Sequence, residues 1–193
     1  LPVFLLIFMV SLNKSLSFNE SFEVVNFVPS TIIFSYTFLT MFSGMLIAKD
    51  RTSSFLSRMF VSPLKAHNYI LGYMIPILII ALIQTAILYV VGNILVSIVF
   101  LLIISVLFIS LGLLFRSILK DQQVGPITSI LIQVVAFLSG MWFSLDLIGG
   151  AFKKVGYLLP FAHSVDLVRD IIKRNTINFK SLAVVLNYIT VIT

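Results

Sequence analysis

The sequence has 193 residues, of which 60% are hydrophobic and 10% are charged, and its net charge is +6. A soluble domain has roughly 25% charged residues, so this composition excludes a water-soluble fold and predicts a protein embedded in lipid. The excess positive charge is typical of membrane-protein loops, and no segment combines basic and aromatic residues as nucleic-acid binding requires. The absence of cysteine excludes a disulfide framework, a thiolate metal site and a cysteine nucleophile.

Uncharged apolar runs predict six membrane-spanning helices, of which we expect the first and last to be cut by the ends of the sequence. A run of about 20 apolar residues is long enough to cross a bilayer as a helix. The uncharged stretch 70–115 is too long for one crossing, and Gly92-Asn93 predicts a tight hairpin within it. The prediction is an all-α, polytopic membrane protein with a single transmembrane domain over residues 1–193. Its spans are 1–10, 28–48, 70–91, 94–115, 124–143 and 182–193.

Residues 144–181 differ from the runs on either side because they mix charged and apolar side chains. Three glycines and Pro160 divide this region into short pieces. We predict two short amphipathic helices that lie at the membrane interface or enter it from one side. Lys and Arg number six on the Asp50 side of the membrane and seven on the other, so the positive-inside rule does not fix the orientation.

The predicted spans contain no Asp, Glu, Lys, Arg or His. An ion-coupled transporter or pump usually needs such an intramembrane group as its relay, so the sequence disfavours this class. Gln84 and Gln133 are among the polar residues within the spans. They could line a substrate path, although hydrogen bonds between helices are the commoner use of such amides.

The residues that could support catalysis do not form a recognisable set. His67 and His163 are predicted in loops on opposite membrane faces, where each would be an interfacial side chain and the two could not share a metal. His163, Asp166 and Arg169 could share one helical face, which would suit a membrane enzyme or, more commonly, structural salt bridges. A G-x-x-x-x-G-K-[ST] loop is absent, so we expect any ATPase to be another chain.

The segment Asp50–Pro63 is the longest polar interruption in the first two-thirds of the sequence. Its periodicity predicts a short amphipathic helix, because apolar and basic residues fall on different faces at helical spacing. Pro63 would end this helix, since the residue before a proline is kept out of the α region. The apolar face holds Phe55, Leu56, Met59 and Phe60, and the other face holds Arg51, Ser54 and Arg58.

Periodicity alone leaves two interpretations of this amphipathic helix open. It could lie in the lipid headgroups, as in a membrane scaffold or sensor that transports nothing. Alternatively, it could dock its Phe and Met side chains into a groove on a partner protein. Because the spans contain no ionisable relay, a contact of this second kind would be the entry point for energy in a transporter.

Asp50–Pro63 resembles the cytoplasmic motif of ABC-2 type transporter permeases, which has the form E-R-x-x-G-T-L-x-R-L-x-x-[TS]-P. It departs from that form at Ser54, where the family usually has Gly, and at Phe55, where it has Thr or Ser. The matching residues are Asp50-Arg51, Leu56, Arg58, Met59 and Ser62-Pro63. Two later stretches are also similar to the family: Leu138–Phe143, with Gly140, looks like l-S-G-x-x-F, and Leu159–Arg169, with Pro160, looks like l-P-x-x-x-x-v…R.

The resemblance implies a permease subunit of an ATP-binding cassette exporter in a bacterial plasma membrane. The unit would contain two permeases, identical or different, and two ATPase subunits, which would carry the ATP and Mg. It would export an amphiphilic drug, peptide or lipid-linked molecule. Residues 144–181, with Gly140, Pro160 and Arg169, would lie on the outer side. The ATPase would dock on Asp50, Arg51, Phe55, Leu56, Arg58, Met59, Phe60 and Pro63.

Overall fold

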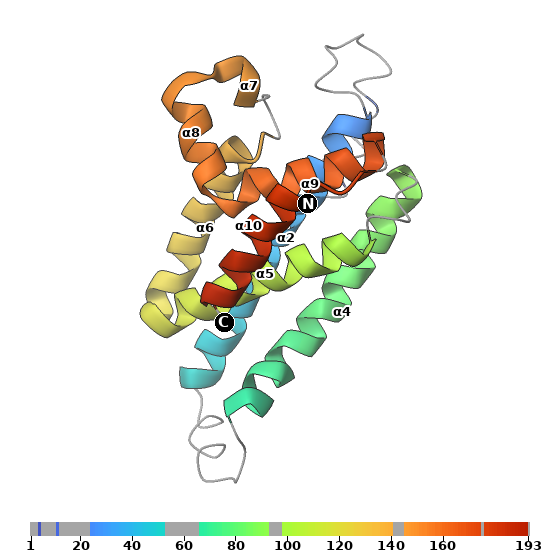
Figure 1. Ribbon diagram of the computed structural model, residues 1–193. Coiled ribbons are helices and arrows are strands. Elements are labelled where there is room, and N and C mark those ends of the chain that lie inside the picture. Colours follow the sequence, from blue (N-terminus) through green and yellow to red (C-terminus); the bar gives the residue numbers. More distant parts are fainter. Residues whose placement is uncertain are drawn as a thin grey trace.

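The computed structural model describes residues 4, 11, 24–52, 66–92, 98–140, 145–174 and 176–192. Within these residues the chain is helical and contains no strand, which confirms the predicted all-α class (Figure 1). The helices are α2 (Val24–Thr52), α4 (Ala66–Gly92), α5 (Ile98–Ile118), α6 (Asp121–Leu138), α7 (Leu145–Ile148), α8 (Gly150–Leu158), α9 (Pro160–Arg174) and α10 (Phe179–Ile192).

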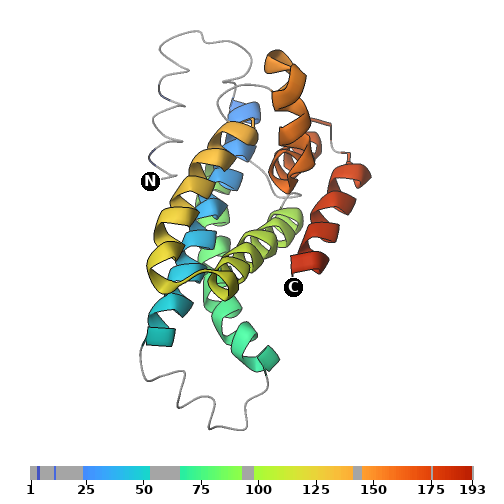
Figure 2. The same ribbon diagram turned by 90° about the vertical axis from the view of Figure 1, so that its left-hand side faces the viewer.

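Helix α2 is the central element of the fold and packs against α4, α5, α6 and α9 (Figures 1 and 2). Most of its apolar stretch Phe27–Asp50 is buried inside the protein. Buried hydroxyls of α2 donate hydrogen bonds to backbone carbonyls one turn earlier. A helix rich in Ser and Thr can therefore be buried with little free-energy cost from unpaired hydroxyl groups. These bonds run from Thr31 to Phe27, from Ser35 to Ile32 and from Thr37 to Phe34.

Two helices in the described part of the chain are long and apolar enough to cross a membrane: Phe27–Asp50 in α2 and Ile98–Ile118, which is α5. They correspond to the predicted spans 28–48 and 94–115. Shorter apolar stretches lie in α4 and α10. The complete six-span topology stays a prediction, because the other predicted spans either fall partly on residues outside the description or are shorter as helices.

The region after α6 differs from the sequence-based prediction. It contains three helices, α7, α8 and α9, where two were predicted. Helix α9 contacts α2 and α10, and its Phe161 and Val165 belong to the main hydrophobic core. Phe161 stacks on Phe108 of α5 with the ring centroids 5.7 Å apart. The apolar face of α9 packs on the bundle, so α9 is part of the core, and its location at the membrane interface stays a prediction.

Helices α2 and α5 cross in close contact because both present small residues at the crossing point. Thr40 Oγ1 donates to Phe108 O at 2.7 Å, and Ser43 Oγ, which donates to Thr40 O at 3.0 Å, also lies 3.5 Å from Ile109 O. A Cβ atom added at Gly112 would overlap Ser43 Oγ and the Thr40 carbonyl. Small residues let helix backbones approach closely in a membrane, where lipid removes the hydrophobic drive for helix association.

Two helix boundaries differ from the sequence-based prediction. Helix α2 continues through Thr52, so Asp50 and Arg51 lie in its last turn and do not begin a separate helix. Helices α5 and α6 are separated by residues 119–120 alone, which is shorter than the predicted loop 116–123. The unbroken α2 therefore links the buried core directly to the polar segment that follows it in the sequence.

Candidate functional site

Helix α2 ends and helix α4 begins at the lower end of Figure 1, and the start of α6 lies beside the last part of α2. Tyr73 of α4 donates its hydroxyl to Asp50 Oδ2 of α2 at 2.6 Å. Tyr73 is buried and Asp50 is half-buried. This bond therefore joins the end of α2 to the first part of α4, the two helices that residues 53–65 connect in the sequence.

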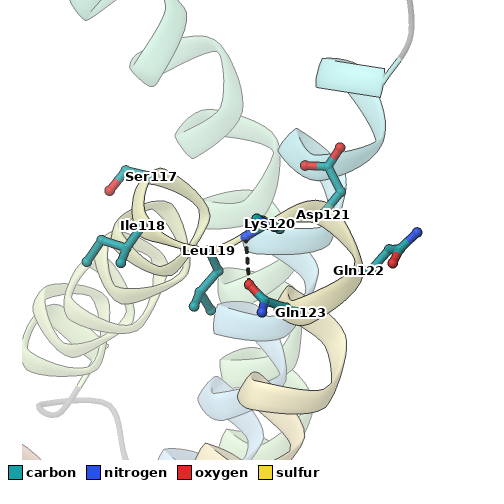
Figure 3. Close-up of a pocket in the computed structure, with 7 residues that line it drawn as sticks. All are labelled: Ser117, Ile118, Leu119, Lys120, Asp121, Gln122 and Gln123. Carbon is teal, nitrogen blue, oxygen red and sulfur yellow. Dashed lines mark hydrogen bonds between the residues drawn. The ribbon is translucent and has the colours of Figure 1, made fainter.

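An ion pair fixes the turn between α5 and α6. Arg116, in the last turn of α5, pairs with Asp121, in the first turn of α6. The Arg116 side chain is 3% exposed, and its Nη1 donates to Leu119 O at 2.9 Å. Each charge lies at the helix end where the helix dipole favours it. The Lys120 backbone N–H donates to Gln123 Oε1 at 3.2 Å, which further stabilises the start of α6 (Figure 3).

Two open recesses lie in the surface of this end. One, of about 610 Å³, is lined by the turn residues 117–123 (Figure 3). The other, of about 360 Å³, lies between α2 and α6, where Met45, Lys49 and Gln122 contribute to its lining. Their linings mix charged, amide and apolar side chains and are open to the outside. Such a surface suits contact with another protein better than enclosure of a small molecule.

A second polar cluster lies at the opposite end, where α9 meets α8 and α10 (Figure 1). His163 is buried there, with Nε2 3.0 Å from Tyr157 O and Nδ1 3.3 Å from Ser181 Oγ. Because a carbonyl can only accept, Nε2 donates to Tyr157 O, while Nδ1 forms the second hydrogen bond with Ser181 Oγ. Both ring nitrogens are engaged, and His163 lies within α9, so its predicted placement in a loop was wrong, while its location at the membrane interface stays a prediction.

The salt bridge predicted from the spacing of Asp166 and Arg169 is confirmed, with 3.8 Å between nitrogen and oxygen. Tyr157 donates its hydroxyl to Asp166 Oδ2 at 2.8 Å, and Arg169 Nη2 donates to Ser30 Oγ of α2 at 3.0 Å. Burial raises the pKa of Asp166 above its ordinary value, while Tyr157 and then Arg169 act in the opposite direction. The cluster therefore links α8, α9 and α2, which is the structural use weighed against the enzyme alternative.

Comparison with known families covers almost the whole chain. The model of a family described as ABC-2 family transporter protein matches residues 3–193. The chain belongs to the ABC-2 transporter family. This match confirms the resemblance carried by Asp50–Pro63 and implies a membrane-embedded transport subunit that associates with an ABC ATPase subunit. No match was found among curated proteins or among solved structures.

The ABC-2 motif lies only partly within the described residues. Asp50 and Arg51 are in the last turn of α2, and Asp50 is held by Tyr73. The predicted amphipathic helix and its docking face stay predictions, because most of their residues lie outside the description. Those residues are Phe55, Leu56, Arg58, Met59, Phe60 and Pro63.

The residues that match the later ABC-2 motifs act at helix ends and between helices. Gly140 follows α6 with φ of 71°, a left-handed conformation that glycine adopts without a steric penalty. Pro160 is the first residue of α9, where its missing N–H costs no helical hydrogen bond. Arg169 connects α9 to Ser30 of α2. Their location on the outer side of the membrane stays a prediction.

The two amides predicted to line an ABC-2 substrate path lie on α4 and α6. Gln84 is half-buried, and its Oε1 is buried without a hydrogen-bond partner among the described residues. Gln133 is exposed on the surface of α6. These positions neither establish nor exclude a path, so both assignments stay predictions.

Sequence reasoning did not identify Tyr73 or the Arg116–Asp121 pair as parts of this end. For the ion pair a signal existed, because two opposite charges lie close together in a short polar stretch between apolar runs. For Tyr73 there was none. Its partner Asp50 is distant in sequence, and their contact depends on how α2 and α4 pack side by side.

Proposed function

We propose that this chain is the six-span permease subunit of an ATP-driven exporter, powered by a separate ATPase that binds at Asp50–Pro63. The observation that carries the proposal is the family match over residues 3–193, within which the family's cytoplasmic motif directly continues the buried helix α2. The permease itself carries no nucleotide in this proposal. ATP and Mg bind to the partner.

The position of the motif explains how ATP-driven movement would reach the membrane. Helix α2 runs without a break from the core to Thr52 and contacts α4, α5, α6 and α9. A force applied just after Thr52 would therefore act on a helix that packs against four others. Packed helices change between discrete arrangements, so a small displacement at the motif can become a larger one in the membrane.

Three further features belong to the same proposal. The transported molecule is amphiphilic, such as a drug, a peptide or a lipid-linked compound, as the family resemblance implies, and Gln84 and Gln133 are the proposed residues of its path. The working unit contains two permeases, identical or different, and lies in the plasma membrane. The motif end faces the cytoplasm, and the end with α7, α8 and α9 faces outward.

Copurification tests the proposal. The full chain, extracted in mild detergent from its own cells, should retain an ATPase with a Walker motif. Replacing the apolar docking residues Phe55→Asp and Met59→Asp together should abolish that retention and the associated ATP hydrolysis, because two carboxylates cannot enter an apolar groove without a large desolvation cost. The permease itself should still insert into the membrane.

The matched control places two aspartates at the other end of the molecule. Leu158 and Phe179 are exposed there, so Leu158→Asp with Phe179→Asp adds the same charge without touching the proposed docking surface. This variant should keep the ATPase. If the native chain retains no ATPase, or if both double variants lose it equally, the docking proposal is wrong and a membrane scaffold becomes the better interpretation.

A further inference from the structure

Two tyrosine hydroxyls connect α2 to α4 at widely separated points. Near the ends of the helices, Tyr73 OH donates to Asp50 Oδ2 at 2.6 Å. Deeper in the bundle, Tyr36 OH lies 2.5 Å from Thr85 Oγ1. At a rise of 1.5 Å per residue, the two bonds are about 20 Å apart along either helix.

The direction of the deeper bond follows from its neighbour. Thr85 Oγ1 uses its proton to donate to Ala81 O at 2.7 Å, so Tyr36 is the donor to Thr85. Tyr36 is 0% and Thr85 2% exposed. Water cannot compete for this bond within the bundle, and replacing either hydroxyl would leave its partner without a substitute from solvent.

The contact of α2 with α4 differs in kind from its contact with α5. The α5 contact uses backbone carbonyls and the close approach at Gly112, so it follows from the main chain itself. In the α4 contact, the polar links are long side chains, each held through a single hydroxyl. One such link would leave rotation and sliding opposed only by apolar packing, such as that of Ile77 and Ala81 in the core, whereas two links far apart add resistance to both.

We propose that α2 and α4 move as one body, and that Tyr73 is the positioning residue that makes them do so. Tyr73 links the helices by a hydrogen bond at the end where residues 53–65 connect them in the sequence. Tyr36 links them by a second hydrogen bond deeper in the bundle. Resting on the proposed function, this means that a displacement produced by the ATPase reaches both helices together. Without Tyr73, part of that displacement would be lost in a change of the angle between them.

Distances between spin labels on α2 and α4 test the link made by Tyr73, and the measurement needs no partner protein. The sequence contains no cysteine, so pairs introduced into the full chain in lipid nanodiscs are labelled cleanly. The first labelled pair is Leu46→Cys of α2 with Ile75→Cys of α4. The reference pair is Leu46→Cys with Ile118→Cys of α5, and all three positions are exposed. Tyr73→Phe should broaden the α2–α4 distance distribution at least twofold and leave the α2–α5 distribution unchanged.

The control removes a tyrosine hydroxyl elsewhere. Tyr188 donates to Leu158 O at 2.9 Å at the opposite end, so Tyr188→Phe should leave both distributions as in the wild type. General loosening of the fold would broaden both pairs, and such a result would overturn the proposal. So would an α2–α4 distribution that stays equally narrow in Tyr73→Phe, because the hydroxyl would then not be what holds the helices together.

A second comparison adds the ATPase that copurifies with the chain, trapped with ATP and vanadate. The α2–α4 distance should stay fixed on trapping in the wild type and shift in Tyr73→Phe. A shift in the wild type would mean that the helices move separately, which overturns the one-body proposal even if transport is confirmed. If no ATPase copurifies, the proposed function fails. The nanodisc comparison alone still supports or overturns the proposal that Tyr73 holds α2 and α4 together.

Discussion

The α2–α5 crossing and the cluster of α8, α9 and α10 hold helices together by opposite means. At the crossing, the absence of a side chain at Gly112 lets two backbones approach. In the cluster, His163 is present between two helices and bonds to both. Lipid provides little hydrophobic drive for contacts between membrane-spanning helices, so the crossing depends on its close approach. The crossing should therefore be sensitive to added atoms, and the cluster to lost hydrogen-bond partners.

The largest effect is expected from adding a side chain at the crossing. Gly112→Val would place a branched side chain where even a Cβ overlaps Ser43 Oγ and the Thr40 carbonyl. The opposing atoms are backbone and a short side chain, which cannot swing away. We expect a loss of about 3 kcal/mol or more in stability, seen as a lower unfolding temperature in detergent.

A glycine elsewhere in the bundle provides the control for Gly112→Val. A Cβ at Gly72 of α4 meets nothing within 4 Å. Gly72→Val should therefore be tolerated, with a small gain from the better helix propensity of valine. Equal destabilisation by the two substitutions would show that valine itself, and not the crossing, is responsible.

A smaller effect is expected from removing a partner in the cluster. His163→Ala would leave Tyr157 O and Ser181 Oγ without their side-chain partner and open a small cavity. We expect a loss of about 2 kcal/mol in stability, measured by thermal unfolding, with transport retained at temperatures where the variant is folded. Lys173→Ala, an exposed change in the same helix, should have almost no effect.

The same substitution separates two roles for His163. A structural histidine affects stability and leaves the chemistry of transport intact. If His163→Ala instead unfolded at the wild-type temperature and had lost all activity, the enzyme alternative built on His163, Asp166 and Arg169 would regain support. The hydrogen bonds to both ring nitrogens make that outcome unexpected.

The sequence predicted the helical class and the regions of α2 and α5 because long uncharged runs have no other stable form in lipid. It did not predict which side of each helix faces the core. Val99 of α5 is 63% exposed and Ile104 is 0% exposed, yet both are β-branched and apolar. When lipid and core favour the same residue types, periodicity loses its contrast. In α9 the apolar face was readable, but such a face can be buried in lipid or against other helices, so its packing against α2 was not predicted.

At the candidate site the sequence identified a segment and missed its attachment. Asp50 was part of a motif that could be read along the chain, whereas Tyr73 is defined only by its contact with Asp50. A hydrogen bond between distant residues leaves no local pattern. The same holds for Gly112, whose importance comes from Thr40 and Ser43 on another helix.

The smallest expected effect concerns the pH dependence of the cluster. Burial raises the pKa of Asp166 above its ordinary value of 3.8, against the opposing effects of Tyr157, Arg169 and His163 and with a small contribution from Asp170. A raised pKa in the folded state means that the neutral carboxyl is favoured on folding. The contribution of Asp166 to stability is therefore fully present at pH values below 3.8, and it is lost as the pH rises through the pKa of the folded state.

Asp166→Asn should remove this contribution while keeping an oxygen to accept from Tyr157. The unfolding temperature of the wild type minus that of Asp166→Asn, followed from about pH 3 to about pH 7, should fall as the pH rises, because titrating groups that do not interact with Asp166 cancel in the difference. A difference that rises with pH would mean that Arg169 and Tyr157 outweigh burial. The ionised Asp166 would then stabilise the cluster through its interactions with Arg169 and Tyr157. The cluster would depend on charge, whereas the α2–α5 crossing involves no charged side chain.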